Sequence, residues 1–114
     1  DNLAMIDSEI DKEGIVRCAI EVKNSPRGTG TELFRRMMEH YGRWVNSIEG
    51  VWESGDNLNA FNDALESGAS PEEAALKTWT GKRAASYGFT KVTITKMGKN
   101  ASGKCKPVHV LFSK

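Results

Sequence analysis

The chain has 114 residues, of which 39% are hydrophobic, and a formal net charge of +1; these values predict a single domain over residues 1–114. It contains no apolar run near the ~20 residues that a membrane-spanning helix needs and no signal-peptide pattern, so we expect no membrane insertion by this domain. The two Cys and two His show no metal-ligand spacing, so we expect reduced thiols, no metal and no cofactor.

The charges are segregated along the chain. All fifteen carboxylates lie in residues 1–73 together with seven basic residues, whereas residues 74–114 carry nine Lys or Arg and no carboxylate. A surface that carries only Lys and Arg lets phosphates replace condensed counterions, which favours a nucleic acid as partner. An ordinary solvated basic face is the alternative, and the composition leaves both interpretations open.

The first part of the chain predicts a hairpin followed by a helix. Apolar and polar residues alternate on both sides of Asp11–Gly14, which predicts a β-hairpin from Ala4 to Val22. After a turn at Asn24–Gly30, an apolar stripe from Leu33 to Tyr41 predicts an amphipathic helix. Gly42 is the expected C-terminal stop of that helix.

Strands and helices alternate again in the middle of the chain. Val45–Trp52 is predicted to be a strand, and a helix with its apolar face from Leu58 to Leu65 is predicted to follow and to end at Gly68. Ser70 and Glu73, with Pro71 between them, form a capping box that begins a third helix, predicted to run through Trp79.

The last part of the chain predicts a second hairpin. Thr80 is the expected N-cap of a short helical segment, Lys82–Tyr87. Two strands, Phe89–Met97 and Val108–Phe112, follow, with the loop Gly98–Pro107 between them. The order ββαβααββ predicts an α/β (α+β) protein with a mixed sheet of about five strands covered by three to four helices.

The turn Arg27–Thr31, between a predicted strand and a predicted helix, is a candidate phosphate site. Free N–H groups and the positive end of a helix bind phosphate there, and glycine permits close approach. A plain glycine-rich turn with Thr31 as N-cap is the alternative. Together with Ala84–Phe89 before a strand, this turn also resembles the acetyl-CoA-binding half of the GNAT N-acyltransferases, which implies acyl transfer as one possible activity.

A second resemblance rests on longer phrases, which occur at Arg27–Thr31, Glu49–Leu58 with Phe61 and Asn62, and Thr78–Lys82 with Gly88–Val92. From about Arg27 to its end, the chain resembles the C-terminal toxin domain of bacterial contact-dependent growth-inhibition and Rhs polymorphic proteins. The resemblance implies a larger secreted or cell-surface effector, delivery into the cytoplasm of a target bacterium, and neutralisation by a cognate immunity protein. Within that group, the chain is similar to ribonucleases that cut transfer RNA with the help of elongation factor Tu.

A ribonuclease without a metal needs a base for the ribose 2′-OH, a cation for the phosphate and a proton donor for the leaving oxygen. We expect Arg27 and Lys82 to stabilise the phosphate and His109 to transfer protons, although His109 also fits an ordinary surface position. Three more residues are predicted to orient the ribose or the phosphate by hydrogen bonds: Thr29, Asn57 and Thr80.

RNA binding is predicted to involve aromatic rings and the basic end of the chain. Trp52 and Trp79 offer faces for base stacking, with a place in the core as the alternative. The expected phosphate contacts are the lysines of the last strands and their loop: Lys91, Lys96, Lys99, Lys104 and Lys106.

The sequence thus predicts a metal-independent ribonuclease of the interbacterial toxin kind, with transfer RNA as its favoured substrate. A GNAT-like acyltransferase and a non-enzymatic RNA- or ribosome-binding module are the alternatives. Binding of coenzyme A, cleavage of RNA, and RNA binding without turnover distinguish the three.

Overall fold

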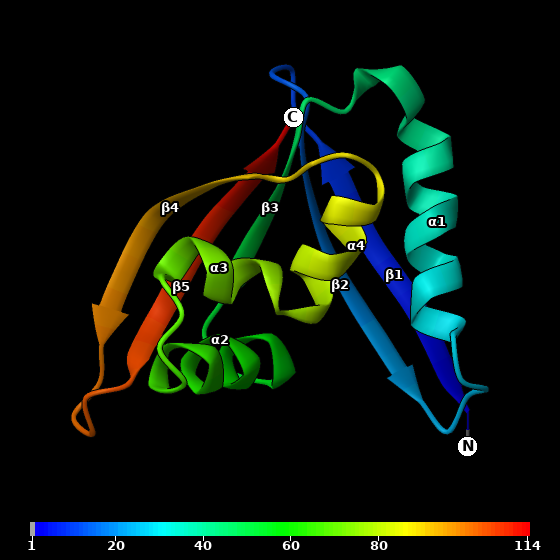
Figure 1. The fold of residues 1–114 in the computed structure, drawn as a ribbon. Coiled ribbons are helices and arrows are strands. Elements are labelled where there is room, and N and C mark those ends of the chain that lie inside the picture. Colours follow the sequence, from blue (N-terminus) through cyan, green and yellow to red (C-terminus); the bar gives the residue numbers. More distant parts are fainter. Residues whose placement is uncertain (1) are drawn as a thin grey trace. The chain divides into compact units, whose positions relative to one another are not determined.

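The computed structural model describes residues 2–114. The elements follow one another in the order β1 β2 α1 β3 α2 α3 α4 β4 β5, with a short 3-10 helix after α1 (Figure 1). Five strands and four helices confirm the predicted α+β class and the predicted order, with the helical region after residue 70 divided in two. The chain forms two compact units, Asp1–Asn46 and Ser47–Lys114.

The hairpin of the first unit consists of β1 (Leu3–Ile10) and β2 (Ile15–Lys23), which pair antiparallel as predicted. One side chain fixes the turn, because the Asp11 carboxylate accepts the N–H groups of Glu13 at 2.9 Å and Ile15 at 3.0 Å. These bonds, the one from Ile15 first, and the nearby Arg17 lower the pKa of Asp11.

Helix α1 (Thr29–Tyr41) packs its buried residues Phe34, Met37 and Met38 toward this hairpin. Its N-cap is Gly28, in the left-handed conformation with φ of 90°, and no side chain caps it. Thr31, the N-cap of the alternative interpretation, is therefore not the cap, because the chain enters the helix at Gly28, three residues earlier. Gly42 ends the helix as predicted, and its N–H bonds the carbonyl of Met38.

The second unit contains a three-stranded antiparallel sheet with β5 (Cys105–Ser113) between β3 (Ser47–Trp52) and β4 (Lys91–Lys99). Strand β5 is longer than the predicted Val108–Phe112, whereas β4 begins and ends two residues later than the predicted Phe89–Met97. The loop that joins them is shorter than the predicted Gly98–Pro107. The Oδ1 atom of Asn100 accepts the N–H groups of Ser102 and Lys104, each at 3.0 Å, and so closes the turn tightly.

Three helices lie on one face of this sheet: α2 (Asp56–Glu66), α3 (Pro71–Leu76) and α4 (Trp79–Ser86) (Figure 1). The predicted capping box of α3 is present, with Ser70 and Glu73 bonding each other's N–H groups. The prediction of Thr80 as a cap was wrong. Thr78, fully buried, caps α4 by accepting the N–H of Gly81 at 2.9 Å and donates to the carbonyl of Ala75 at 2.6 Å.

The core of the second unit lies between these helices and the sheet. On β5, alternate residues face the helices, and Val108, Val110 and Phe112 are fully buried. Phe61 of α2 and Ile48 of β3 are fully buried as well. The period of two along β5 therefore assigns the residues between them, including His109, to the other face.

Candidate active site

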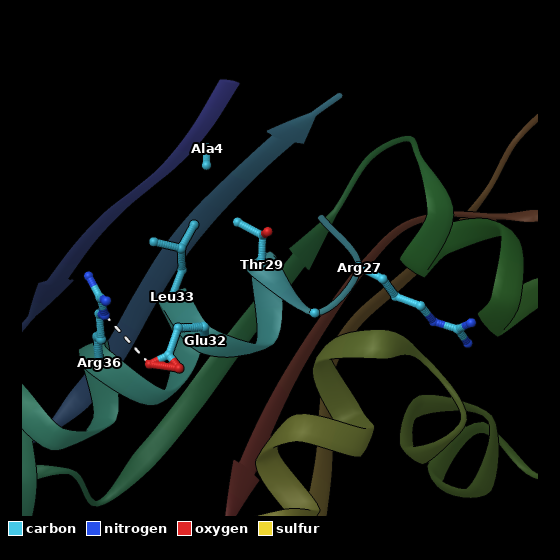
Figure 2. A pocket seen from close by; sticks show the side chains of 7 residues that line it. Ala4, Arg27, Thr29, Glu32, Leu33 and Arg36 are labelled. Carbon is cyan, nitrogen blue, oxygen red and sulfur yellow. Dashed lines mark ion pairs between the residues drawn. The ribbon is translucent and has the colours of Figure 1, made fainter. Parts of the chain in front are cut away.

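The predicted phosphate turn lies beside an open hollow of about 490 Å³ in the first unit, lined by Ala4, Arg27, Gly28, Thr29, Glu32, Leu33 and Arg36. Figure 2 shows Arg27 extending away from Glu32 and Arg36, which form an ion pair at 3.5 Å. The hydroxyl of Thr29 donates to the carbonyl of Pro26 at 2.6 Å. The guanidinium of Arg35 donates to the Glu32 carboxylate, and this hydrogen bond is the main reason why the pKa of Glu32 is lowered. The hollow is thus lined by two cationic side chains, Arg27 and Arg36, and by one carboxylate, Glu32, which pairs with Arg36.

In the second unit, Asn57 and Thr80 form a reciprocal pair. The Nδ2 group of Asn57 donates to Thr80 Oγ1 at 3.0 Å, and the N–H of Thr80 donates to Asn57 Oδ1 at 3.1 Å. Thr80 is only 9% exposed. The pair therefore ties the first turn of α4 to the first turn of α2 and satisfies an N–H group that the helix itself leaves unpaired. Both side chains are used in helix packing, which is a structural role.

The two tryptophans predicted to stack on bases lie in different surroundings. Trp52 is 5% exposed, and its ring centre lies 6.1 Å from that of Phe61 and 6.3 Å from that of Phe112. Its prediction as a stacking face was wrong, because the inward period of β3 buries it. Trp79 is half-buried, and the guanidinium of Arg83 lies 5.5 Å from the centre of its ring.

His109 lies on the face of the sheet opposite α2–α4, which we call the open face. It is half-buried, and in the register of β3 with β5 it stands directly across from Val51, which is 47% exposed. On its other side it stands directly across from Lys96 of β4, whose side chain is exposed. Directly paired residues of two strands project to the same face, so Lys96 and His109 are neighbours on the open face.

A β-bulge in β4 produces this arrangement. The register changes between Ile94, which pairs with Val110, and Lys96, which pairs with His109, so Thr95 is an extra residue. The Thr95 hydroxyl donates to the carbonyl of His109 at 3.2 Å. In a regular strand Lys96 would share the helix-covered face with Ile94, and the bulge instead moves it to the open face.

The other predicted RNA-binding lysines, Lys91, Lys99, Lys104 and Lys106, are all exposed. Lys91 pairs with Ser113 and so belongs to the open face, at the far end of β4 from Lys96. The Nζ atom of Lys104 lies 3.8 Å from a carboxylate oxygen of Glu66, an exposed pair of little energetic weight. Lysines and bulges on an edge strand also discourage pairing with other chains, which is an alternative role for those of β4.

The predicted catalytic set is therefore divided. Arg27 and Thr29 belong to the first unit, and the other four residues belong to the second. Within the second unit, Lys82 is exposed on α4, which packs with α2 on the helix-covered side, whereas His109 projects from the open face. Lys82 and His109 therefore belong to elements or faces on opposite sides of the sheet.

Glu49 is a residue of the open face that sequence reasoning did not select. It is half-buried and pairs with Leu111, two residues along β5 from His109. Among the strand residues of the second unit it is the one carboxylate. Its alternation with Ile48 and Gly50, both buried, was the available signal, but its nearness to His109 depends on the register between two strands far apart in sequence.

Residues 2–114 contain no group of three or more His, Cys, Asp or Glu side chains placed to hold a metal ion. In the same range, no helix is both long and apolar enough to cross a membrane. Comparison of the chain with protein-family models, with curated proteins and with solved structures gives no match in any of the three.

Proposed function

We propose that this domain is a metal-independent ribonuclease whose active site is the open face of the β3–β5–β4 sheet. The observation that carries the proposal is the bulge at Thr95, which pairs Lys96 directly with His109 on that face. Histidine transfers protons near neutral pH, and a cation beside it stabilises the charge of a phosphorane. Bulges are over-represented next to active sites, where they re-aim a side chain.

The proposed biological setting is that of a delivered toxin. The resemblance to the C-terminal domains of contact-dependent growth-inhibition and Rhs proteins supports transfer RNA as substrate, elongation factor Tu as a possible helper and a cognate immunity protein as inhibitor. The nine Lys and Arg of residues 74–114 independently support a polyanionic substrate, because the exposed ones can neutralise phosphates.

Purified domain incubated with transfer RNA in EDTA, with and without elongation factor Tu, tests this proposal. We expect cleavage in EDTA both with and without elongation factor Tu. His109→Ala should lose on the order of 10²–10⁴ in cleavage rate at an unchanged melting temperature. Cleavage abolished by EDTA and restored by Mg²⁺ contradicts the metal-free mechanism. RNA binding without cleavage under all conditions identifies a binding module, and binding of coenzyme A without RNA cleavage favours an acyltransferase.

A further inference from the structure

We infer that the open face binds single-stranded RNA, with the phosphate backbone along β4 and the bases over β5 and β3. The inference rests on the proposed function and names the form of RNA that the site accepts. It follows from two observations: the spacing of Lys91 and Lys96 on this face, and the apolar side chains beside them.

The bulge brings Lys91 and Lys96 to one face. The two lysines are five residues apart, an odd number, which in a regular strand places them on opposite faces. Their partners on β5, Ser113 and His109, are four residues apart, so the lysines are separated by about 13 Å along the strands. An extended RNA strand advances by a similar length in two nucleotides. Lys96, across from His109, can therefore hold the phosphate that is cut, and Lys91 the phosphate two nucleotides away.

Beside the lysines, the open face carries apolar side chains. Leu111 of β5 pairs with Thr93 of β4, in the row between the two lysines, and Val51 of β3 pairs with His109. Leu111 is half-buried and Val51 is 47% exposed. Unpaired bases can lie on such side chains, whereas a duplex turns its bases inward and presents phosphates and groove edges. These apolar side chains therefore favour a single strand.

The positions of the charges direct the backbone to β4. Lys91 and Lys96 are exposed, and β4 is an edge strand, so a phosphate chain can reach both lysines from solvent. Glu49 of the open face lies on β3, and β5 separates it from both lysines. Neighbouring strands lie about 4.8 Å apart, so a path along β4 runs roughly 10 Å from β3. Phosphates along β4 thus meet cations, and the bases are directed toward Leu111.

Equilibrium binding of 2′-O-methyl oligonucleotides, which cannot be cut by attack of the 2′-oxygen, tests the form of RNA. At physiological salt, wild type should bind an unstructured single strand more tightly than a hairpin of equal length, by on the order of tenfold. Lys91→Gln should reduce the slope of log affinity against log salt by ~0.7 for the single strand. The matched control is Lys77→Gln at the end of α3, an exposed lysine whose loss should leave that slope unchanged.

A scan of the same single strand with neutral phosphates tests the spacing. Replacing one phosphate at a time by a methylphosphonate removes its charge. In wild type, two positions should weaken binding most, and they should be two nucleotides apart. Lys91→Gln should become insensitive to replacement at one of these positions and Lys96→Gln at the other, which also gives the direction of the strand.

Two further variants test the contact with the bases. Leu111→Asn should lose on the order of tenfold in affinity for the single strand and keep its affinity for the hairpin. Val51→Ser, at a more exposed position, should show the same selective loss, about threefold, at an unchanged melting temperature. If Leu111→Asn fails to fold, Val51→Ser decides the question. An equal loss for both forms of RNA in Val51→Ser overturns the inference.

The outcomes separate this inference from the proposed function. If wild type cleaves RNA but binds the hairpin as tightly as the single strand, the domain is a ribonuclease and the inference fails. The inference also fails if Lys91→Gln keeps the wild-type slope, or if the two sensitive phosphates are not two nucleotides apart. Selective binding of the single strand without cleavage of unmodified RNA supports the binding mode and contradicts the proposed function. If wild type neither binds nor cleaves RNA, both fail.

Discussion

The two faces of the β3–β5–β4 sheet use their polar side chains in different ways. On the helix-covered face, Asn57 and Thr80 satisfy each other, and Asn62 exchanges hydrogen bonds with the backbone of Cys105 at 2.8 and 3.0 Å. On the open face, the side chains of His109 and Lys96 take part in no such network within residues 2–114. Polar residues on the covered face support the fold, whereas the proposed function uses His109 and Lys96 of the open face.

Polar side chains thus have different roles on the two faces. Asn57 is half-buried and bonds Thr80 through both its amide nitrogen and its amide oxygen, so helix packing accounts for it. A histidine and a lysine on an exposed sheet add nothing comparable to stability. Substitutions on the two faces should therefore separate stability from activity.

The largest effect is expected at Trp52 on the covered face. Trp52→Ala should lower the free energy of unfolding by about 3–5 kcal/mol, because it removes a large buried ring beside Phe61 and Phe112. The rate of RNA cleavage per folded molecule should change by less than tenfold. Urea unfolding and single-turnover assays measure the two effects, with Trp44→Ala as control, since that ring is 66% exposed. If Trp52→Ala instead loses affinity for RNA at unchanged stability, Trp52 does stack on bases.

The next largest effect is expected at Lys96 on the open face. Lys96→Ala should lower the rate by on the order of 10²–10³, comparable to the loss of one electrostatic donor, and leave the melting temperature unchanged. Lys77→Ala is the matched control, because Lys77 is an exposed lysine at the end of α3. Equal rates for the two variants would show that the bulge has no catalytic purpose and that Lys96 serves only to protect an edge strand.

Local patterns in the sequence predicted most of the fold. The hairpins, the amphipathic stripe of α1 and the capping box at Ser70 follow from periods of two or 3.6 and from short-range hydrogen bonds. The misplaced caps show where such patterns fail. Thr78 and Thr80 have the same hydroxyl, and the choice of Thr78 depends on its bond to Ala75 in the preceding helix.

The candidate site was only partly predictable. His109 and Lys96 were selected from their chemistry, but a regular alternation along β4 assigns Lys96 to the covered face. The bulge that moves it depends on how β4 pairs with β5, which no local pattern specifies. Glu49 was missed for the same reason, since its partner strand lies about sixty residues further along the chain.

A smaller effect is expected at Asn57 on the covered face. Asn57→Ala removes both hydrogen bonds to Thr80 and leaves the N–H group of Thr80 without that partner. The loss should cost about 1–3 kcal/mol of stability. Cleavage per folded molecule should remain within threefold of wild type. Asn59→Ala, on the exposed side of the same helix, should change stability by less than ~0.5 kcal/mol. A loss of rate in Asn57→Ala at wild-type stability would contradict the structural role assigned to this pair.

The smallest effect is expected at Lys82, and it distinguishes the two faces most directly. Lys82 and Lys96 are both exposed lysines of the second unit, so a general electrostatic attraction for RNA treats them alike. Only Lys96 shares a face with His109. Lys82→Ala should therefore weaken binding slightly, change the cleavage rate by less than tenfold and alter stability by less than ~0.5 kcal/mol.

Titration of RNA binding against salt, beside single-turnover rates, separates the two contributions of these lysines. Each lysine that neutralises a phosphate contributes ~0.7–0.9 to the slope of log affinity against log salt. If both lysines contact phosphates, Lys82→Ala and Lys96→Ala should reduce that slope equally, while only Lys96→Ala reduces the rate at saturating RNA. A large loss of rate in Lys82→Ala, with wild-type rates in His109→Ala and Lys96→Ala, would move the active site to the helix-covered side of the sheet.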